Sequence, residues 1–162
     1  MTAAPALEIR AYRPEDRADV VRLHEELQTY ERAFRATRAV GGEVSEWQVR
    51  EYEDMMAKED ARLLIAARGG AAVGYAFFLA EREELEAEPG QIYVQDFMVT
   101  ASARRAGVGS ALMAAVRAFG DEHGLGRIDL QVLVGNDAAL AFHRAQGFDT
   151  SYLGLKAVLA AR

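Results

Sequence analysis

The sequence predicts an α/β or α+β fold, in which one central sheet is covered by helices on both faces. The first observation is that short apolar or alternating segments, typical of strands, are interspersed with longer segments of helical apolar spacing. Their order is strand, two helices, three strands, helix, strand, helix, strand, and such mixing is typical of this fold class. The second observation is that 162 residues, 51% hydrophobic and 27% charged, suit a single globular domain over residues 1–162.

The first part of the chain is predicted to form a strand and two helices. Leu7–Tyr12 alternates apolar and polar residues, as a half-buried strand does. Pro14 suits the first turn of the next helix, in which His24 is counted with the polar residues. The residues of this helix predicted to face the core are Val20, Leu23, Leu27 and Tyr30. Ser45 and Gln48 resemble a capping box, so the second helix is expected to run from Ser45 to about Lys58.

A hairpin is predicted next. Arg62–Ala67 and Ala72–Ala80 read as strands, and Gly69-Gly70 marks the turn between them. Gly74 lies within the second strand and indicates a bulge or a close approach of another backbone. The acidic residues 81–88 are predicted to form a solvated loop.

The rest of the chain alternates strands with helices. The predicted elements are a strand Ile92–Val99, a helix Val108–His123 ending at Gly124, a strand Arg127–Val134, a helix capped by Asn136 and ended by Gly147, and a strand Phe148–Leu159.

A glycine-containing turn between the third predicted helix and the strand before it is suited to bind an anion. The first N–H groups of a helix lack intrahelical partners and carry partial positive charge, and glycines let a ligand approach closely. The turn consists of Arg104, Arg105, Ala106, Gly107, Val108, Gly109 and Ser110. Leu112 stands where a dinucleotide-binding fingerprint needs its third glycine, and the chain has no Gly-Lys-Ser/Thr of a P-loop. We therefore predict a pyrophosphate site of another kind.

Two motifs together resemble a known family. Arg-x-x-Gly-x-Gly at Arg104–Gly109 is followed by Asn-x-x-Ala-x-x-Phe-His-x-x-x-Gly-Phe at Asn136–Phe148. The pair resembles the GNAT superfamily of N-acetyltransferases, and the resemblance covers nearly the whole chain. It implies a mixed, mostly antiparallel sheet that splays between the fourth and fifth strands. It also implies acetyl-CoA as cosubstrate, direct attack by a primary amine in a ternary complex, and a homodimer.

The resemblance also assigns residues to the cofactor and to catalysis. It implies that the turn wraps the pyrophosphate of CoA and that Phe97, Met98 and Val99 pair with its pantetheine arm. It further implies that Asn136 and Ala139 contact the cofactor. His143 stands where the family most often has a tyrosine that protonates the CoA thiolate, and histidine can do the same. The alternative is that His143 only packs in its helix and has no role in catalysis.

The acceptor side is similar to that of the diamine (polyamine) acetyltransferases, with one departure. Those enzymes carry Glu-Asp where this chain has Gln95-Asp96, and Gln95 cannot act as a base. Because successive strand residues face opposite sides, at most one of this pair is expected to face the slot directly. Tyr30-Glu31 is similar to their Tyr-Glu pair, although an ordinary amphipathic helix end explains it equally well. These residues favour a small cationic amine.

Two alternative functions stay open. The first is acetylation of a protein N-terminus or lysine, which needs an open groove near Trp47. The second is a non-catalytic acyl-CoA-binding module, which the missing tyrosine and glutamate would permit.

Composition excludes several other classes. A net charge of −6 argues against a nucleic-acid partner, and the absence of cysteine excludes thiolate chemistry and disulfides. The three histidines lie far apart in the chain, so we predict no metal. No apolar run approaches membrane-spanning length, and Met1–Leu7 is too short for a signal peptide, so we expect no membrane partner and a cytoplasmic location.

Overall fold

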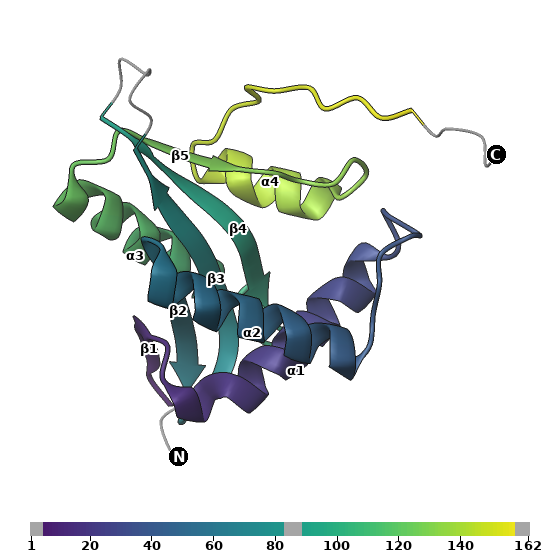
Figure 1. The fold of residues 1–162 in the computed structure, drawn as a ribbon, viewed down its shortest axis with the longest axis vertical. Helices are drawn as coiled ribbons and strands as arrows, with labels where there is room; N and C mark the ends of the chain where they lie inside the picture. Colours follow the sequence, from purple (N-terminus) through teal and green to yellow (C-terminus); the bar gives the residue numbers. More distant parts are fainter. Residues whose placement is uncertain (1–4, 83–88, 158–162) are drawn as a thin grey trace.

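The structure is a computed structural model that describes residues 5–82 and 89–157, and the described residues form one mixed α/β layered fold (Figure 1). The elements are β1 Leu7–Ala11, a 3₁₀ turn Pro14–Asp16, α1 Arg17–Glu31, α2 Gly42–Lys58, β2 Ala61–Arg68, β3 Ala71–Glu81, β4 Gln91–Val99, a 3₁₀ turn Ala101–Ala103, α3 Val108–His123, β5 Arg127–Leu130 and α4 Asp137–Ala145. None of the described helices is both long enough and apolar enough to cross a membrane.

The sheet has the strand order β1-β2-β3-β4-β5, with antiparallel neighbours except for the parallel pair β4–β5. The predicted fold class, a mostly antiparallel mixed sheet, is confirmed. Figure 1 shows α1 and α2 on one face of the sheet and α3 on the other. Two buried clusters fill these two interfaces. The first includes Val20, Leu23, Val49, Tyr52, Ile65 and Phe77, and the second includes Ala66, Phe78, Ile92, Val108, Leu112 and Val116.

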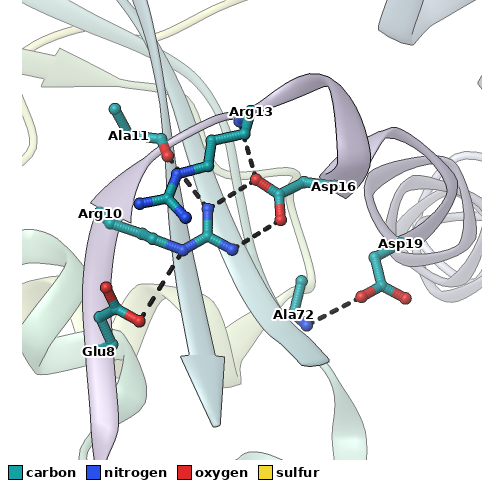
Figure 2. Close-up of polar contacts among 7 residues, drawn as sticks. All are labelled: Glu8, Arg10, Ala11, Arg13, Asp16, Asp19 and Ala72. Atoms are coloured by element: carbon teal, nitrogen blue, oxygen red, sulfur yellow. Dashed lines mark hydrogen bonds and ion pairs between the residues drawn. The ribbon is translucent and has the colours of Figure 1, made fainter. Parts of the chain in front are cut away.

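A partly buried ion pair joins β1 to the turn that leads into α1 (Figure 2). The guanidinium of Arg10 donates to both carboxylate oxygens of Asp16 at 2.7 Å, and Asp16 also accepts the Arg13 N–H at 2.8 Å. The Arg10 bond lowers the pKa of Asp16 below its ordinary value. One turn later, Asp19 accepts the Ala72 N–H at 2.9 Å, which joins α1 to the start of β3. These contacts set the angle at which α1 crosses the sheet.

Gly74 shows both features that its place in a strand predicts. Ala66 pairs with Gly74 but Ala67 pairs with Ala72, so one extra residue of β3 forms a bulge next to it. A Cβ at Gly74 would lie 2.6 Å from the carbonyl oxygen of Met98. Only glycine therefore lets β3 and β4 approach at this point.

Replacing Gly74 with alanine is expected to destabilise the fold by at least about 2 kcal/mol, because backbone rather than a flexible side chain must move to relieve the overlap. Urea unfolding measures the change. Gly42→Ala is the matched control, since no described atom lies within 4 Å of its Cβ position, and its unfolding free energy should change by less than about 1 kcal/mol. Equal effects of the two changes would contradict this explanation.

Three predicted boundaries are wrong. Ser45 does not cap a helix: α2 begins at Gly42, and Ser45 lies one turn inside it, fully buried and bonded to His24. The strand predicted to reach Val134 ends at Leu130, because β4 offers β5 no pairing beyond Val94. Residues 148–157 contain no strand, and their side chains Tyr152, Leu153 and Leu155 are exposed. Among the strands that the structure describes, none pairs with these residues. The rest of that predicted strand, and most of the acidic loop 81–88, lie outside the described residues.

Candidate active site

The sheet opens at a bulge in β4. Phe77 pairs with Asp96 and Phe78 with Val94, so Gln95 has no partner in β3. The parallel pairing of β4 with β5 ends at the same place, at Val94 and Leu130. The predicted splay between the fourth and fifth strands is therefore present, and the bulge is where it starts. Gln95 and Asp96 both line the opening, although the two-residue period of a strand predicted at most one of them there, and the extra residue of the bulge breaks this period.

A cavity of about 700 Å³ occupies this opening. Its walls come from the end of α1, the second half of β4, the turn before α3, residues 130–133 and α4. It brings together sixteen of the seventeen predicted site residues: Tyr30, Glu31, Gln95, Asp96, Phe97, Met98, Val99, Arg104, Arg105, Gly107, Val108, Gly109, Ser110, Asn136, Ala139 and His143. Ala106 belongs to the turn but does not line the cavity, and neither does Trp47.

The turn before α3 presents free N–H groups. Gly107 is the N-cap residue and has φ +78°, which favours glycine, and no described side chain caps this end of the helix. The Ala111 N–H donates to the carbonyl of Gly107 at 3.0 Å, so the N–H groups of the preceding residues Val108, Gly109 and Ser110 lack intrahelical acceptors. This end of α3 is therefore suited to an anion.

The two glycines of the turn have different roles. Gly107 supplies the positive φ, and no described atom lies within 4 Å of its Cβ position. A Cβ at Gly109, in contrast, would lie 3.0 Å from the ring of Phe142. Gly109 therefore makes room for an aromatic ring of α4 that lines the cavity, which is a different reason from the ligand approach that the sequence suggested.

Replacing Gly109 with alanine is expected to weaken CoA binding about threefold to tenfold, roughly 1 kcal/mol, because the Phe142 ring must shift into the cavity. Isothermal titration with CoA measures the dissociation constant. Gly42→Ala, far from the cavity lining, is the control and should bind as tightly as wild type. Unchanged affinity of the Gly109 variant would show that the ring position does not matter for the cofactor.

The open edge of β4 offers backbone groups to a bound chain. The Thr100 N–H donates to Val73 of β3 at 2.9 Å, so by alternation Met98 also faces β3. The N–H and C=O groups of Phe97 and Val99 then face the opening. Arg104 confirms this direction, because its Nε donates to the Val99 carbonyl at 3.0 Å.

Tyr30 connects α1 to both sides of the opening. Its ring lies under the guanidinium of Arg104, with 5.1 Å from Cζ to the ring centroid. Its hydroxyl donates to Asn136 Oδ1 at 3.3 Å, and the same oxygen accepts the Ala139 N–H at 3.3 Å. Asn136 is thus the N-cap of α4, as predicted, and its side chain also lines the cavity.

His143 lines the cavity from α4 but is only 7% exposed. Its ring is surrounded by those of Phe97, Phe142 and Phe148, at centroid distances of 5.0 to 5.7 Å. Its Nδ1 is buried and has no hydrogen-bond partner among the described residues. Burial lowers the pKa of His143 to about 4, so the imidazole is neutral at neutral pH in the free protein.

Asp96 is the other titratable group of the opening with a large shift. Burial raises its pKa to about 6, although the hydroxyl of Tyr52, which donates to Oδ2, acts in the opposite direction. His24 Nε2 lies 3.9 Å from the same oxygen. A carboxylate with this pKa is mostly ionised at neutral pH and can still accept a proton efficiently.

A buried polar network behind the cavity was missed by the sequence analysis. It contains Ser45, His24, Gln28 and Arg38, and it ends at Glu31, whose Oε2 lies 2.9 Å from a guanidinium nitrogen of Arg38. His24 is 2% exposed rather than solvated. The spacing of His24 and Gln28, one residue after Leu23 and Leu27, does place them beside the apolar stripe of α1. Arg38 follows α1 in an irregular segment, and no sequence pattern indicated its partner.

Among the described residues, no group of three or more His, Cys, Asp or Glu side chains could hold a metal ion.

Comparison with known proteins agrees with this geometry. The Acetyltransferase (GNAT) family matches residues 21–148. No curated protein matches significantly. Similar solved structures include a tetramutant of the BH1408 protein from Bacillus halodurans (18% identity, TM-score 0.79, 94% of this chain and 99% of that one). An acetyltransferase of Trypanosoma brucei has 19% identity and a TM-score of 0.72, with 95% and 100% covered. An aminoglycoside acetyltransferase from an uncultured soil metagenomic sample has 17% identity and a TM-score of 0.72, with 95% and 97% covered. At these identities the structures show the shared fold alone.

The family match spans most of the chain, so the chain belongs to the GNAT acetyltransferase family. The protein is an acyl-CoA-dependent N-acetyltransferase, and the cosubstrate of this family is acetyl-CoA.

Proposed function

We propose that this enzyme transfers the acetyl group of acetyl-CoA to a small cationic primary amine by direct attack in a ternary complex. The observation that carries the proposal is one continuous cavity. It joins the free N–H groups at the start of α3 to Asp96, along the open edge of β4 and past His143. Cofactor and amine bound at its two ends would meet at the bulge, and such positioning supplies much of the rate of a two-substrate reaction.

The cofactor end would hold the pyrophosphate of CoA. The N–H groups of Val108, Gly109 and Ser110 face an anion there, and Arg104 and Arg105 line the same part of the cavity. The backbone groups of Phe97 and Val99 would pair with the pantetheine arm as a further strand does. A backbone N–H at Val99 would also polarise the thioester carbonyl.

The amine must lose a proton before it attacks, because its pKa is about 10. Asp96 is the carboxylate in the cavity with a pKa near neutrality, and it would accept this proton directly or through one water. Gln95, its neighbour on the bulge, would hydrogen-bond the amine. The nitrogen then bonds to the acetyl carbon, and the carbon–sulfur bond breaks.

His143 would assist the departing thiolate. Its imidazole enters the reaction neutral, so it first donates a hydrogen bond from its ring N–H to the sulfur on which charge develops. The negative sulfur raises the pKa of the imidazole, so the ring takes up a second proton from solvent as the carbon–sulfur bond breaks. It then passes one proton to the thiolate to release CoA, and Asp96 returns the proton of the amine to solvent. We also infer from the resemblance a cytoplasmic homodimer, and light scattering of the purified protein tests the dimer.

The test is a panel of amines assayed for release of CoA. Because the chain contains no cysteine, a thiol-specific reagent reports only the released cofactor. A small primary monoamine, a polyamine and a peptide with a free N-terminus are compared, and the acetylated product is identified by mass spectrometry. We expect turnover with a small amine. Turnover with the peptide alone would show protein acetylation instead, and CoA binding without turnover on any acceptor would indicate a non-catalytic module.

A further inference from the structure

The acceptor end of the cavity contains two carboxylates and an internal cation. Among the described residues that line the cavity, Glu31 and Asp96 are the acidic ones. Arg38, from the segment between α1 and α2, lies 2.9 Å from Glu31 Oε2. This oxygen is buried and accepts no hydrogen bond among the described residues, so its contact with Arg38 is an ion pair alone. Glu31 therefore borders the cavity with its charge already matched from behind.

A hydrogen bond to Gln28 also holds Arg38 in this place. Its Nε donates to Oε1 of Gln28, a residue that is 4% exposed. Arginine has no acceptor atom, so the amide oxygen of Gln28 must face it and the amide nitrogen must face the other way. That nitrogen lies 3.0 Å from Nε2 of His24. The position of the Arg38 side chain is thus fixed by a buried partner as well as by Glu31.

The hydrogen bond between Gln28 and His24 determines the charge of His24. Because the Gln28 amide donates to His24 Nε2, this nitrogen accepts and the ring proton lies on Nδ1, which is 2.8 Å from Ser45 Oγ. His24 is therefore neutral. Its pKa, lowered to about 4 by burial and by the charge of Arg38, agrees with this assignment. His24 adds no charge to the site although it lies 3.9 Å from Asp96.

The remaining charges of the acceptor end leave room for a single cation. The charges of Arg38 and Glu31 balance. Of the two acidic residues that line the described part of the cavity, Asp96 is the one that no cationic side chain is bonded to. A second ammonium group would meet Glu31, whose charge Arg38 already balances from outside the cavity lining. Much of the remaining wall is apolar and includes Leu27, Phe97, Val132 and Leu133.

We propose that the acceptor is a primary monoamine with an uncharged remainder, and that Arg38 sets this specificity by balancing the charge of Glu31, which would otherwise attract the second ammonium of a diamine. This inference rests on the proposed function and names its substrate class more narrowly. It separates this enzyme from the diamine branch to which its Tyr30-Glu31 pair is similar.

The first test compares pentylamine with 1,5-diaminopentane, which have the same chain length and differ in the second ammonium. The wild-type kcat/KM should favour pentylamine at least tenfold, although the diamine has two reactive ends. Equal or reversed preference would overturn the inference and leave the proposed function standing. Turnover of neither amine, with turnover of a peptide, would instead overturn the proposed function.

The second test changes the internal cation. Arg38→Gln should move the kcat/KM ratio at least tenfold toward the diamine, because Glu31 is then free to bind the second ammonium. The double variant Arg38→Gln, Glu31→Gln should keep the wild-type ratio, since both charges are gone. Arg32→Gln is the control, because it removes the same charge from an exposed residue nearby, and it should keep the wild-type kcat/KM ratio. An unchanged ratio in Arg38→Gln would overturn the role of Arg38.

Arg38→Gln leaves a buried carboxylate without its partner, so circular dichroism checks that each variant is folded. If the single variant unfolds, the wild-type ratio and the double variant still decide the proposal. A diamine-selective double variant would contradict it, because that protein offers the diamine no second carboxylate.

Discussion

Replacing Asp96 with asparagine is expected to lower kcat about 10²- to 10⁴-fold, the usual contribution of a general base. The change preserves shape and the bond from Tyr52 but removes the proton acceptor. CoA affinity should stay within about twofold of wild type, because Asp96 lies at the acceptor end of the cavity. Steady-state kinetics and CoA titration measure the two effects. Asp121→Asn, an exposed residue of α3, is the control and should leave both unchanged.

The pH profile makes the test specific. Burial raises the pKa of Asp96 to about 6, and the active form is the ionised one. The wild-type kcat/KM, which reports the pKa values of the free enzyme, should therefore fall as the pH decreases through about 6. Asp96→Asn should lack this acidic limb. A variant that retained the limb, or a kcat near the wild-type value, would assign the proton to another group or to water.

Replacing His143 with phenylalanine is expected to lower kcat at least about tenfold, because the thiolate then leaves without a hydrogen-bond donor. The aromatic surroundings of Phe97, Phe142 and Phe148 accept a phenyl ring, so the fold and the CoA dissociation constant should be preserved. Single-turnover kinetics separate this step from product release.

His143→Tyr provides the matched comparison. It differs from the phenylalanine variant by one hydroxyl group, which is the donor that the family resemblance implies at this position. We expect His143→Tyr to recover most of the lost turnover. If phenylalanine and tyrosine variants turn over equally, and both at the wild-type rate, His143 has only a packing role.

Two structural features of the candidate site could be predicted from local chemistry. Gly107 adopts a positive φ at a helix N-terminus, and Asn136 caps the helix that it begins. Both roles follow from short patterns. The splay of the sheet was predicted from the family resemblance. The structure shows that it starts at the bulge at Gln95.

The network at the acceptor end could not be predicted, because it depends on contacts between distant segments. His24 was predicted to be a solvated helix residue, but α2 packs over it and Ser45 is bonded to its ring. Ser45 in turn looked like a helix cap, although the helix starts a turn earlier. Arg38 pairs with Glu31 across an irregular segment whose path no local pattern fixes.

The last predicted strand failed for a related reason. A strand needs an adjacent strand with free backbone groups, and none of the described strands pairs with residues 148–157. β5 ends at Leu130, and the side chain of Leu155 is exposed. Sequence periodicity carries no information about whether such a neighbour is present.

The central claim is that the N-terminus of α3 binds the pyrophosphate of CoA and directs the acyl end toward His143. Calorimetric titration tests it with two ligands, CoA and 4′-phosphopantetheine, which lacks the pyrophosphate. We expect one saturable CoA site per chain and an affinity for 4′-phosphopantetheine at least about 100-fold weaker, which corresponds to about 2.7 kcal/mol. Equal affinities, or no saturable heat with CoA, would contradict the account.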